Sequence, residues 1–323
     1  VMLFLDPPDH DRIRRTVSRA FTPRAIGALE PRIAAIATEL VREFVDGGSG
    51  DVVAGLSGRL PVYVIGEVLG VPTEDWEQLR TWSDATVRAL SVRAGADGDD
   101  AAAAVAGAMA LHTYLDGVAD RYRSQPSETI AGQLVALEAT GEIDRAELVG
   151  FLQLMFVAGH ETTAALLTRA IELLAADPTL FARVKDDRAL VTALVEEVLR
   201  TYGPLQRLFR IATVDTEIAG LPVPAGASVV VLLGSASRDD TRFQAGDAFD
   251  LDAADTAHLA FGQGIHFCLG APLARLEARI ALDSLLDAVA SIELVPDRVP
   301  ERFFGGTTSE LQTTSLWITA VAP

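Results

Sequence analysis

The stretch Phe261-Gly262-Gln263-Gly264-Ile265-His266-Phe267-Cys268-Leu269-Gly270-Ala271-Pro272 contains the one cysteine of this 323-residue chain. A lone cysteine can form no internal disulfide and cannot supply most of a tetrahedral zinc site. Gly262 and Gly264 let the backbone turn tightly and approach another group closely. Pro272 favours the first turn of a helix, so Cys268 precedes a helix N-terminus, where N–H groups and the helix dipole stabilise a thiolate. The stretch predicts a thiolate on a rigid loop, among apolar side chains that suit a large flat cofactor with a central metal.

Most free cysteines are simply buried in a protein core, and the residues alone leave that reading open. The run from Phe261 to Gly270, however, resembles the haem-binding signature Phe-Gly-x-Gly-x-His-x-Cys-x-Gly of the cytochrome P450 family and matches it at each fixed position. The resemblance implies that Cys268 is the axial ligand of a haem iron and that the cofactor is haem b (iron protoporphyrin IX). It also implies that Phe261, Gly262, His266 and Gly270 contact the haem.

A second polar segment, Ala158-Gly159-His160-Glu161-Thr162-Thr163, interrupts an apolar pattern that predicts a helix from about Arg145 to Ala176. A helix that is apolar around most of its girth lies in a core, where polar groups are costly unless they have partners. Gly159 lowers helix propensity but removes a side chain, which lets a cofactor or dioxygen lie against the backbone. Thr162 can donate a hydrogen bond back to the carbonyl of Ala158 and loosen the helix locally.

Two other interpretations of this segment follow from its residues. His160-Glu161 begins like the zinc-protease pattern His-Glu-x-x-His, but residue 164 is alanine, so the second ligand is absent. The threonines could also be ordinary helix residues. The segment resembles the acid–alcohol motif of the cytochrome P450 family. The resemblance implies that Ala158 and Gly159 lie against the haem, that Thr162 hydrogen-bonds dioxygen there, and that Glu161 relays protons to it.

Three basic side chains are candidates for holding the haem propionates together with His266. His10 and Arg14 lie four residues apart and share a face of a helix that follows the turn Asp6-Pro7-Pro8-Asp9. Their spacing fits a solvated pair equally well, and Arg210 could be an edge-strand charge. The patterns Asp-Pro-Pro-x-His-x-x-x-Arg and Phe-Arg-x-Ala resemble the family's propionate-binding segments. The resemblance therefore assigns His10, Arg14 and Arg210 to that role.

Glu197 and Arg200 lie three residues apart and can pair on one helix face, although exposed pairs of this kind contribute little stability. The resemblance places the family's Glu-x-x-Arg here and implies a buried structural pair on the thiolate side, needed for haem insertion. One departure bears on this pair. Many family members have an arginine just before the Phe-Asp pair at 249–250, and this chain has Ala248. We expect the extra support to come from elsewhere or to be weaker.

The hydrophobic periodicity predicts a mainly α-helical chain with small β-sheets, taken as one domain over residues 1–323. The resemblance implies the cytochrome P450 fold without its N-terminal elements, and because residue 1 is valine we expect a truncated chain. The predicted helices comprise one ending at Phe21, Ile26–Asp46, Pro61–Leu69, Glu74–Leu90, Ala101–Arg123, Ser127–Thr140, Arg145–Ala176, one starting at Pro178, Ala189–Thr201 and one ending near Val289. The predicted strands are Leu208–Ala212, Thr216–Ile218, Leu221–Val223, Ser228–Leu233, Ile292–Val295 and Ser315–Val321.

Bulk composition narrows the functional classes. A net charge of −18 argues against a nucleic-acid partner. No apolar run approaches the length of a membrane helix, and the first residues do not read as a signal peptide. A single cysteine fits a reducing compartment, so we expect a cytoplasmic protein without membrane contact.

The resemblance implies a monooxygenase that inserts one oxygen atom of O₂ into a small apolar substrate, by hydroxylation or epoxidation. No flavin- or nicotinamide-binding stretch is visible, because Gly262-x-Gly264 does not continue to a glycine at 267. We therefore expect electrons from a ferredoxin and its NAD(P)H-dependent reductase. A basic patch could dock an acidic ferredoxin, and its residues are Arg12, Arg15, Arg19, Arg275 and Arg279.

Three alternatives remain at this stage. A peroxide-driven haem-thiolate enzyme would use the same Cys268 but often lacks the acid–alcohol pair. A haem-binding sensor or carrier, which is not an enzyme, would not need Glu161 and Thr162. A cysteine hydrolase would need a base beside the thiol, and the neighbours of His266 do not build a recognisable oxyanion site.

Overall fold

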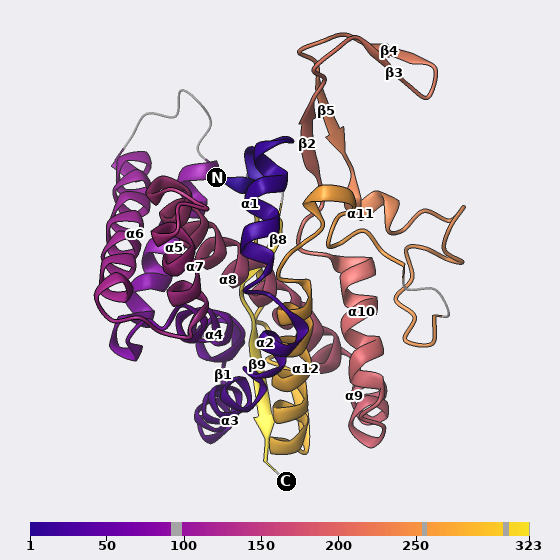
Figure 1. Ribbon diagram of the computed structural model, residues 1–323. Coiled ribbons are helices and arrows are strands. Elements are labelled where there is room, and N and C mark those ends of the chain that lie inside the picture. Colours follow the sequence, from indigo (N-terminus) through magenta and orange to yellow (C-terminus); the bar gives the residue numbers. More distant parts are fainter. Residues whose placement is uncertain (92–98, 254–256, 306–309, 323) are drawn as a thin grey trace.

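The computed structural model describes residues 1–91, 99–253, 257–305 and 310–322. Helix α8 (Arg145–Ala176) has the predicted bounds and contacts α4–α7, α9, α10 and α12 (Figure 1). Its first turn is held by a capping box, in which Asp144 Oδ1 accepts from Glu147 N at 2.7 Å and Glu147 Oε2 accepts from Asp144 N at 2.9 Å. The helix ends where Pro178 follows Asp177, because proline disfavours helical backbone before it.

The other helices surround α8 and, together with it, account for more than half of the described chain (Figure 1). They are α1 (Asp9–Ser18), α2 (Pro23–Gly27), α3 (Glu30–Asp46), α4 (Leu60–Leu69), α5 (Trp76–Ser91), α6 (Asp99–Ser124), α7 (Ile130–Ala139), α9 (Pro178–Asp186), α10 (Leu190–Tyr202), α11 (Leu233–Ala236) and α12 (Ala271–Ala288). Short 3₁₀ turns cover Met2–Phe4, Thr73–Asp75 and Gly264–His266, and a π-turn covers Val53–Ser57.

The strands in the described parts of the chain form four small antiparallel sheets. One sheet has the order β1 (Ser49–Asp51), β9 (Trp317–Val321), β6 (Ser291–Leu294), with Gly50 opposite Ile318 and Ile292 opposite Ala320. The remaining sheets are hairpin-like pairs: β2 (Leu208–Ile211) with β5 (Ser228–Val231), β3 (Thr216–Ile218) with β4 (Leu221–Val223), and β7 (Glu301–Gly305) with β8 (Glu310–Ser315). The β3–β4 hairpin extends away from the helices (Figure 1). The predicted class, mainly α with small sheets, is confirmed.

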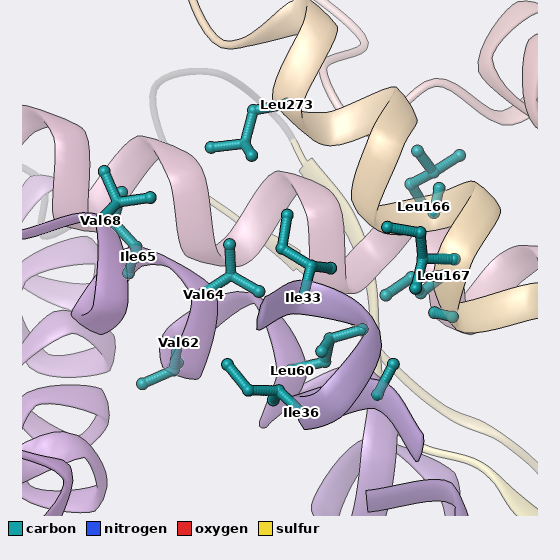
Figure 2. Packing of buried hydrophobic residues seen from close by; sticks show 14 of the residues in the cluster. Ile33, Ile36, Leu60, Val62, Val64, Ile65, Val68, Leu166, Leu167 and Leu273 are labelled. Carbon is teal, nitrogen blue, oxygen red and sulfur yellow. The ribbon is translucent and has the colours of Figure 1, made fainter. Parts of the chain in front are cut away.

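The hydrophobic core lies where α3, α4, α8 and α12 meet (Figure 2). Ile33 and Ile36 of α3 face Leu60 and Val64 of α4, and each of these side chains is at most 5% exposed. Burying one aliphatic side chain of this size stabilises a fold by about 1.5–3 kcal/mol. The packing of these four helices therefore positions the polar segment of α8 and the loop before α12.

Three predicted elements differ from the structure. The predicted helix Ile26–Asp46 is two helices, because Pro31 has no N–H for an interior helical bond and instead occupies the first turn of α3. The predicted strand Ser228–Leu233 ends at Val231, and Leu233 begins α11 with a buried side chain. The predicted strand Ser315–Val321 is broken at Leu316, whose N–H donates to Asp51 Oδ1 at 3.0 Å. None of the described helices is both long and apolar enough to span a bilayer.

Candidate active site

The loop from Phe261 to Cys268 is a closed turn. The N–H of Cys268 donates to the carbonyl of Phe261 at 2.9 Å, and the N–H of Phe267 donates to the carbonyl of Gly264 at 3.0 Å. Gly262 and Gly264 have φ of 68° and 77°, a region that L-residues with a side chain disfavour. An added Cβ would meet no atom within 4 Å at either position. The glycines are therefore needed for backbone conformation, and open space lies in front of them.

The thiol of Cys268 lies between two opposing electrostatic effects. Burial raises its pKa, whereas the N–H groups of Gly270 and Ala271 and the charge of Arg14 lower it. Burial has the larger effect, so the thiol of the ligand-free protein holds its proton more tightly than an ordinary cysteine. The N–H groups of the following helix do act as predicted, but they do not create a thiolate unaided. A metal ion at the sulfur would displace the proton.

Basic side chains from separate elements gather beside this loop. Helix α1 presents His10 and Arg14 on one face, as predicted: Arg14 Nη2 donates to the carbonyl of Phe267 at 2.8 Å, and the His10 ring lies 4.3 Å from the His266 ring between centroids. Burial, followed by the positive charges of His10 and Arg210, lowers the pKa of His266. Arg210 itself is exposed on β2, where its Nη1 donates to the carbonyl of Phe209 at 2.8 Å.

One buried atom of this cluster has no hydrogen-bond partner in the described part of the chain. His10 is 1% exposed, and its Nε2 is buried with no hydrogen-bond partner among the residues that the structure describes. A buried polar atom without a partner is costly, so it marks a place for a ligand or water. An acceptor with negative charge would satisfy Nε2 and the neighbouring cations together. Carboxylates at the edge of a metal-bearing macrocycle over Cys268 fit this donor set.

The polar segment of α8 has the predicted local geometry. Thr162 Oγ1 donates to the carbonyl of Ala158 at 2.9 Å, which is the back-bond expected from the sequence. Gly159 faces α4: a Cβ placed on it would lie 3.5 Å from Ile65 Cδ1. A Cβ at this position would make an ordinary van der Waals contact with Ile65, so packing against α4 would also tolerate alanine. Only the backbone of Gly159 is left to contact a cofactor. Glu161 is half-buried.

His160, which belongs to the incomplete zinc-protease pattern, has partners on α5. Its Nδ1 lies 3.3 Å from Ser83 Oγ and its Nε2 lies 3.9 Å from Asp84 Oδ1. Burial lowers the pKa of His160 to about 4, helped by the charge of Arg80. The ring is therefore neutral at physiological pH. Its contacts link α5 to α8 at the position next to Glu161. No group of three His, Cys, Asp or Glu in the described chain could hold a bare metal ion.

Glu197 and Arg200 form the buried pair that the sequence predicts. Arg200 Nε and Nη2 donate to Glu197 at 2.8 and 2.7 Å, and the side chains of Arg200 and Glu197 are 3% and 1% exposed. Main-chain groups take the place of the arginine absent at Ala248. Arg200 donates to three carbonyls, those of Ser237 (3.1 Å), Gly246 (2.7 Å) and Ala248 (2.7 Å), and Glu197 Oε1 accepts from the N–H of Asp250 at 2.8 Å.

A second network was not predicted. Arg275 of α12 forms a two-point ion pair with Glu196 of α10, at 2.6 and 2.8 Å, and His258 Nε2 lies 3.2 Å from the same carboxylate. The sequence signal, an acidic residue beside Glu197, is too common to indicate a partner that is 79 residues away. The charge of Glu196 is held by these contacts, which lower its pKa to about 2 although burial acts to raise it.

Comparison with known proteins decides the family. The family model for cytochrome P450 matches residues 109–309. The chain belongs to the cytochrome P450 family. This cytochrome P450 is 41% identical over 300 residues to Cytochrome P450 109 of Bacillus spizizenii, which covers 90% of this chain and 73% of that protein. It is also 41% identical over 293 residues to the cyclomarin C epoxidase CymV of Salinispora arenicola, covering 90% of this chain and 73% of that enzyme.

The structural comparison agrees with the sequence comparison. The crystal structure of CYP109E1 from Bacillus megaterium in complex with testosterone superposes with a TM-score of 0.89 at 36% identity, covering 99% of this chain and 86% of that chain. The predicted family and fold are thus confirmed, and the protein is a cytochrome P450 monooxygenase of bacterial type with a haem cofactor. Membership of this family excludes the cysteine hydrolase.

Proposed function

We propose that this cytochrome P450 binds haem b through Cys268 and inserts one oxygen atom of O₂ into a small apolar substrate, by hydroxylation or epoxidation. The observation that carries the proposal is the unpartnered, buried Nε2 of His10 among basic side chains beside the cysteine loop. When bound, the haem supplies dioxygen activation and substrate oxidation, and thiolate ligation favours O–O cleavage. The relatives include an epoxidase, and a structural neighbour carries testosterone, which supports an apolar substrate.

The proposal gives the residues of the cysteine side two tasks. Cys268 ligates the iron, and N–H groups at Gly270 and Ala271 hydrogen-bond its sulfur and moderate its charge. Phe261 and Gly262 flank the ring system. The carboxylates of the cofactor are held by charge-assisted hydrogen bonds, which are stronger than neutral ones. Their donors are His10, Arg14, Arg210 and His266.

The residues of α8 handle protons in this proposal. Thr162 donates a hydrogen bond to the carbonyl of Ala158, which leaves lone pairs on Oγ1 to accept a hydrogen bond from Glu161 or from water. Rotation of the hydroxyl then lets Thr162 donate toward the cofactor side. Ala158 keeps this wall free of a bulky side chain, and Gly159 offers only its backbone to the cofactor. Bound cofactor and substrate would exclude bulk water here and confine protons to this path.

The structure changes the expected docking surface for a ferredoxin. Among the five predicted basic residues, four pair with glutamates: Arg12 with Glu147, Arg19 with Glu142, Arg275 with Glu196 and Arg279 with Glu30. Only Arg15 of this set has no carboxylate partner within the described ranges. Electrons from a ferredoxin and its NAD(P)H-dependent reductase remain part of the proposal, with weaker charge attraction than predicted. So does a cytoplasmic location, which rests on the lone cysteine.

The deciding experiment combines a spectrum with an isotope measurement. The reduced protein under carbon monoxide should give the thiolate-type spectrum, and Cys268→His should abolish it. Turnover with ferredoxin, reductase and isotopically labelled dioxygen should place one labelled atom in the product. Product formed with peroxide alone, and not with the electron-transfer partners, would favour the peroxide-driven enzyme. If the protein binds haem but oxidises none of the ligands that shift its spin state, the non-catalytic haem-binding protein is the remaining alternative.

A further inference from the structure

Three side chains from distant segments meet behind the cysteine loop. Glu196 accepts two hydrogen bonds from the guanidinium of Arg275, and His258 Nε2 lies 3.2 Å from Glu196 Oε2. The N–H of Ala260 donates to His258 Nδ1 at 3.2 Å, so Nδ1 is the acceptor of the neutral ring and Nε2 carries the proton that points to Glu196. Both carboxylate oxygens of Glu196, both ring nitrogens of His258 and the Nε and Nη2 atoms of Arg275 thus have defined partners.

The network reaches the loop through the ring of Phe261. The guanidinium carbon of Arg275 lies 4.5 Å from the centroid of this ring, and the His258 ring lies 5.9 Å from it. The carbonyl of Phe261 in turn accepts the N–H of Cys268 at 2.9 Å. A displacement of Arg275 would therefore act on Phe261, and through its main chain on the sulfur-bearing residue.

The contacts are of kinds that hold position well. A two-point arginine–carboxylate pair fixes the plane of the guanidinium, and a cation over an aromatic face adds about 0.5–2 kcal/mol. The side chain of His258 is 3% exposed and that of Glu196 is 18% exposed, so solvent screening of their contact is limited. Arg275 is 39% exposed, yet its charge is matched by Glu196, which makes it a poor anchor for an acidic partner.

We propose that Glu196, Arg275 and His258 form a brace that holds the Phe261–Cys268 loop in the geometry required for thiolate ligation. Arg275 is then a positioning residue and not a docking residue for the electron donor. The inference rests on the proposed function only in taking Cys268 as the haem ligand. The brace is separate from the Glu197–Arg200 pair, because its contacts go to the loop itself whereas that pair contacts the segment 237–250.

The test compares substitutions of Arg275 with Arg279→Gln. Arg279 lies one turn further along α12, is equally 39% exposed and also pairs with a glutamate, Glu30. In the holoenzyme, the reduced CO complex of Arg275→Gln should lose thiolate ligation several-fold faster than that of the wild type. The midpoint potential of the haem should also shift in this variant. Arg279→Gln should change neither. Arg275→Lys separates charge from geometry: it keeps the charge but loses the fork and the stacking, so it should behave like Arg275→Gln.

The outcomes are distinguishable from one another. If Arg275→Gln and Arg275→Lys keep the wild-type CO spectrum and potential, the brace is wrong. The alternative result is that Arg275→Gln changes only the KM for ferredoxin, in a salt-dependent way, while Arg275→Lys keeps the wild-type KM. That result would show that Arg275 contributes its charge to ferredoxin docking. Should Arg275→Gln fail to fold, Phe261→Leu tests the same link from the other side and should also hasten loss of thiolate ligation. A wild-type protein without the thiolate spectrum would instead overturn the proposed function.

Discussion

Glu197 and Arg200 form an ion pair in the protein interior that is closed by main-chain groups of the segment 237–250 and not by a third side chain. Both carboxylate oxygens of Glu197 and all three guanidinium nitrogens of Arg200 have hydrogen-bond partners. Removal of one member leaves the other charged, buried and unpaired. The cost of such a change is far larger than that of losing an exposed pair.

Arg200→Ala should therefore lower the free energy of unfolding by about 3–5 kcal/mol. Urea unfolding and the yield of haem-loaded protein measure this change. Arg183→Ala is the matched control, because Arg183 pairs with Asp252 at 2.8 Å on the surface and should cost less than about 1 kcal/mol. Equal losses in the two variants would show that the interior pair has no special weight.

Thr162→Ala should uncouple NAD(P)H consumption from product formation. The substitution removes the hydroxyl that bonds the carbonyl of Ala158, so the proposed proton path loses its last group while the helix keeps its shape. We expect NAD(P)H use to continue, with product per NAD(P)H reduced several-fold and peroxide released. Thr162→Ser keeps the hydroxyl and should stay close to wild type. Unchanged coupling in Thr162→Ala would exclude the assignment.

His160 should make the fold sensitive to acid. Because burial lowers the pKa of His160 from 6.5 to about 4, the unfolded chain binds the proton more readily than the folded one. The contribution of the neutral ring is complete above the unfolded pKa and is lost as the pH falls toward about 4. Between these limits we expect a loss of up to about 3 kcal/mol that His160→Gln does not show. Urea unfolding of both proteins at neutral and at acid pH checks the difference.

Cys268 of the haem-free protein should react slowly with iodoacetamide at neutral pH, because burial raises the pKa of its thiol. The reaction rate should rise at higher pH than for an ordinary cysteine. Arg14→Ala removes a positive charge that lowers this pKa, so it should shift the profile further toward alkaline pH. A profile that Arg14→Ala does not move would show that the guanidinium does not act on the sulfur.

Much of the site could be predicted from local sequence because local chemistry determines it. The turn around Gly262 and Gly264, the back-bond of Thr162 and the shared face of His10 and Arg14 each depend on residues within a few positions. The partners of His160 and of Glu196 could not be predicted in this way, because Ser83 lies 77 residues and Arg275 lies 79 residues away. The balance of effects on Cys268 also depends on burial, which no local pattern reports.

The break between α2 and α3 shows a different limit. The apolar spacing from Ile26 to Asp46 continues through it, and Pro31 was the only local sign that the backbone could not. The absence of an arginine at Ala248 is visible in the sequence, but its replacement by carbonyl groups depends on the path of the segment 237–250. Main-chain partners leave no trace in side-chain patterns.

The hydrogen bond from Arg14 to the carbonyl of Phe267 joins residues that are 253 positions apart. During synthesis, α1 leaves the ribosome long before the cysteine loop exists, and at typical bacterial rates the interval is on the order of tens of seconds. Throughout that time Arg14 of α1 lacks its hydrogen-bond partner in the cysteine loop. If Cys268 holds the haem as proposed, the cofactor can be captured only after this loop has been made, and a cell short of haem would accumulate complete chains without it.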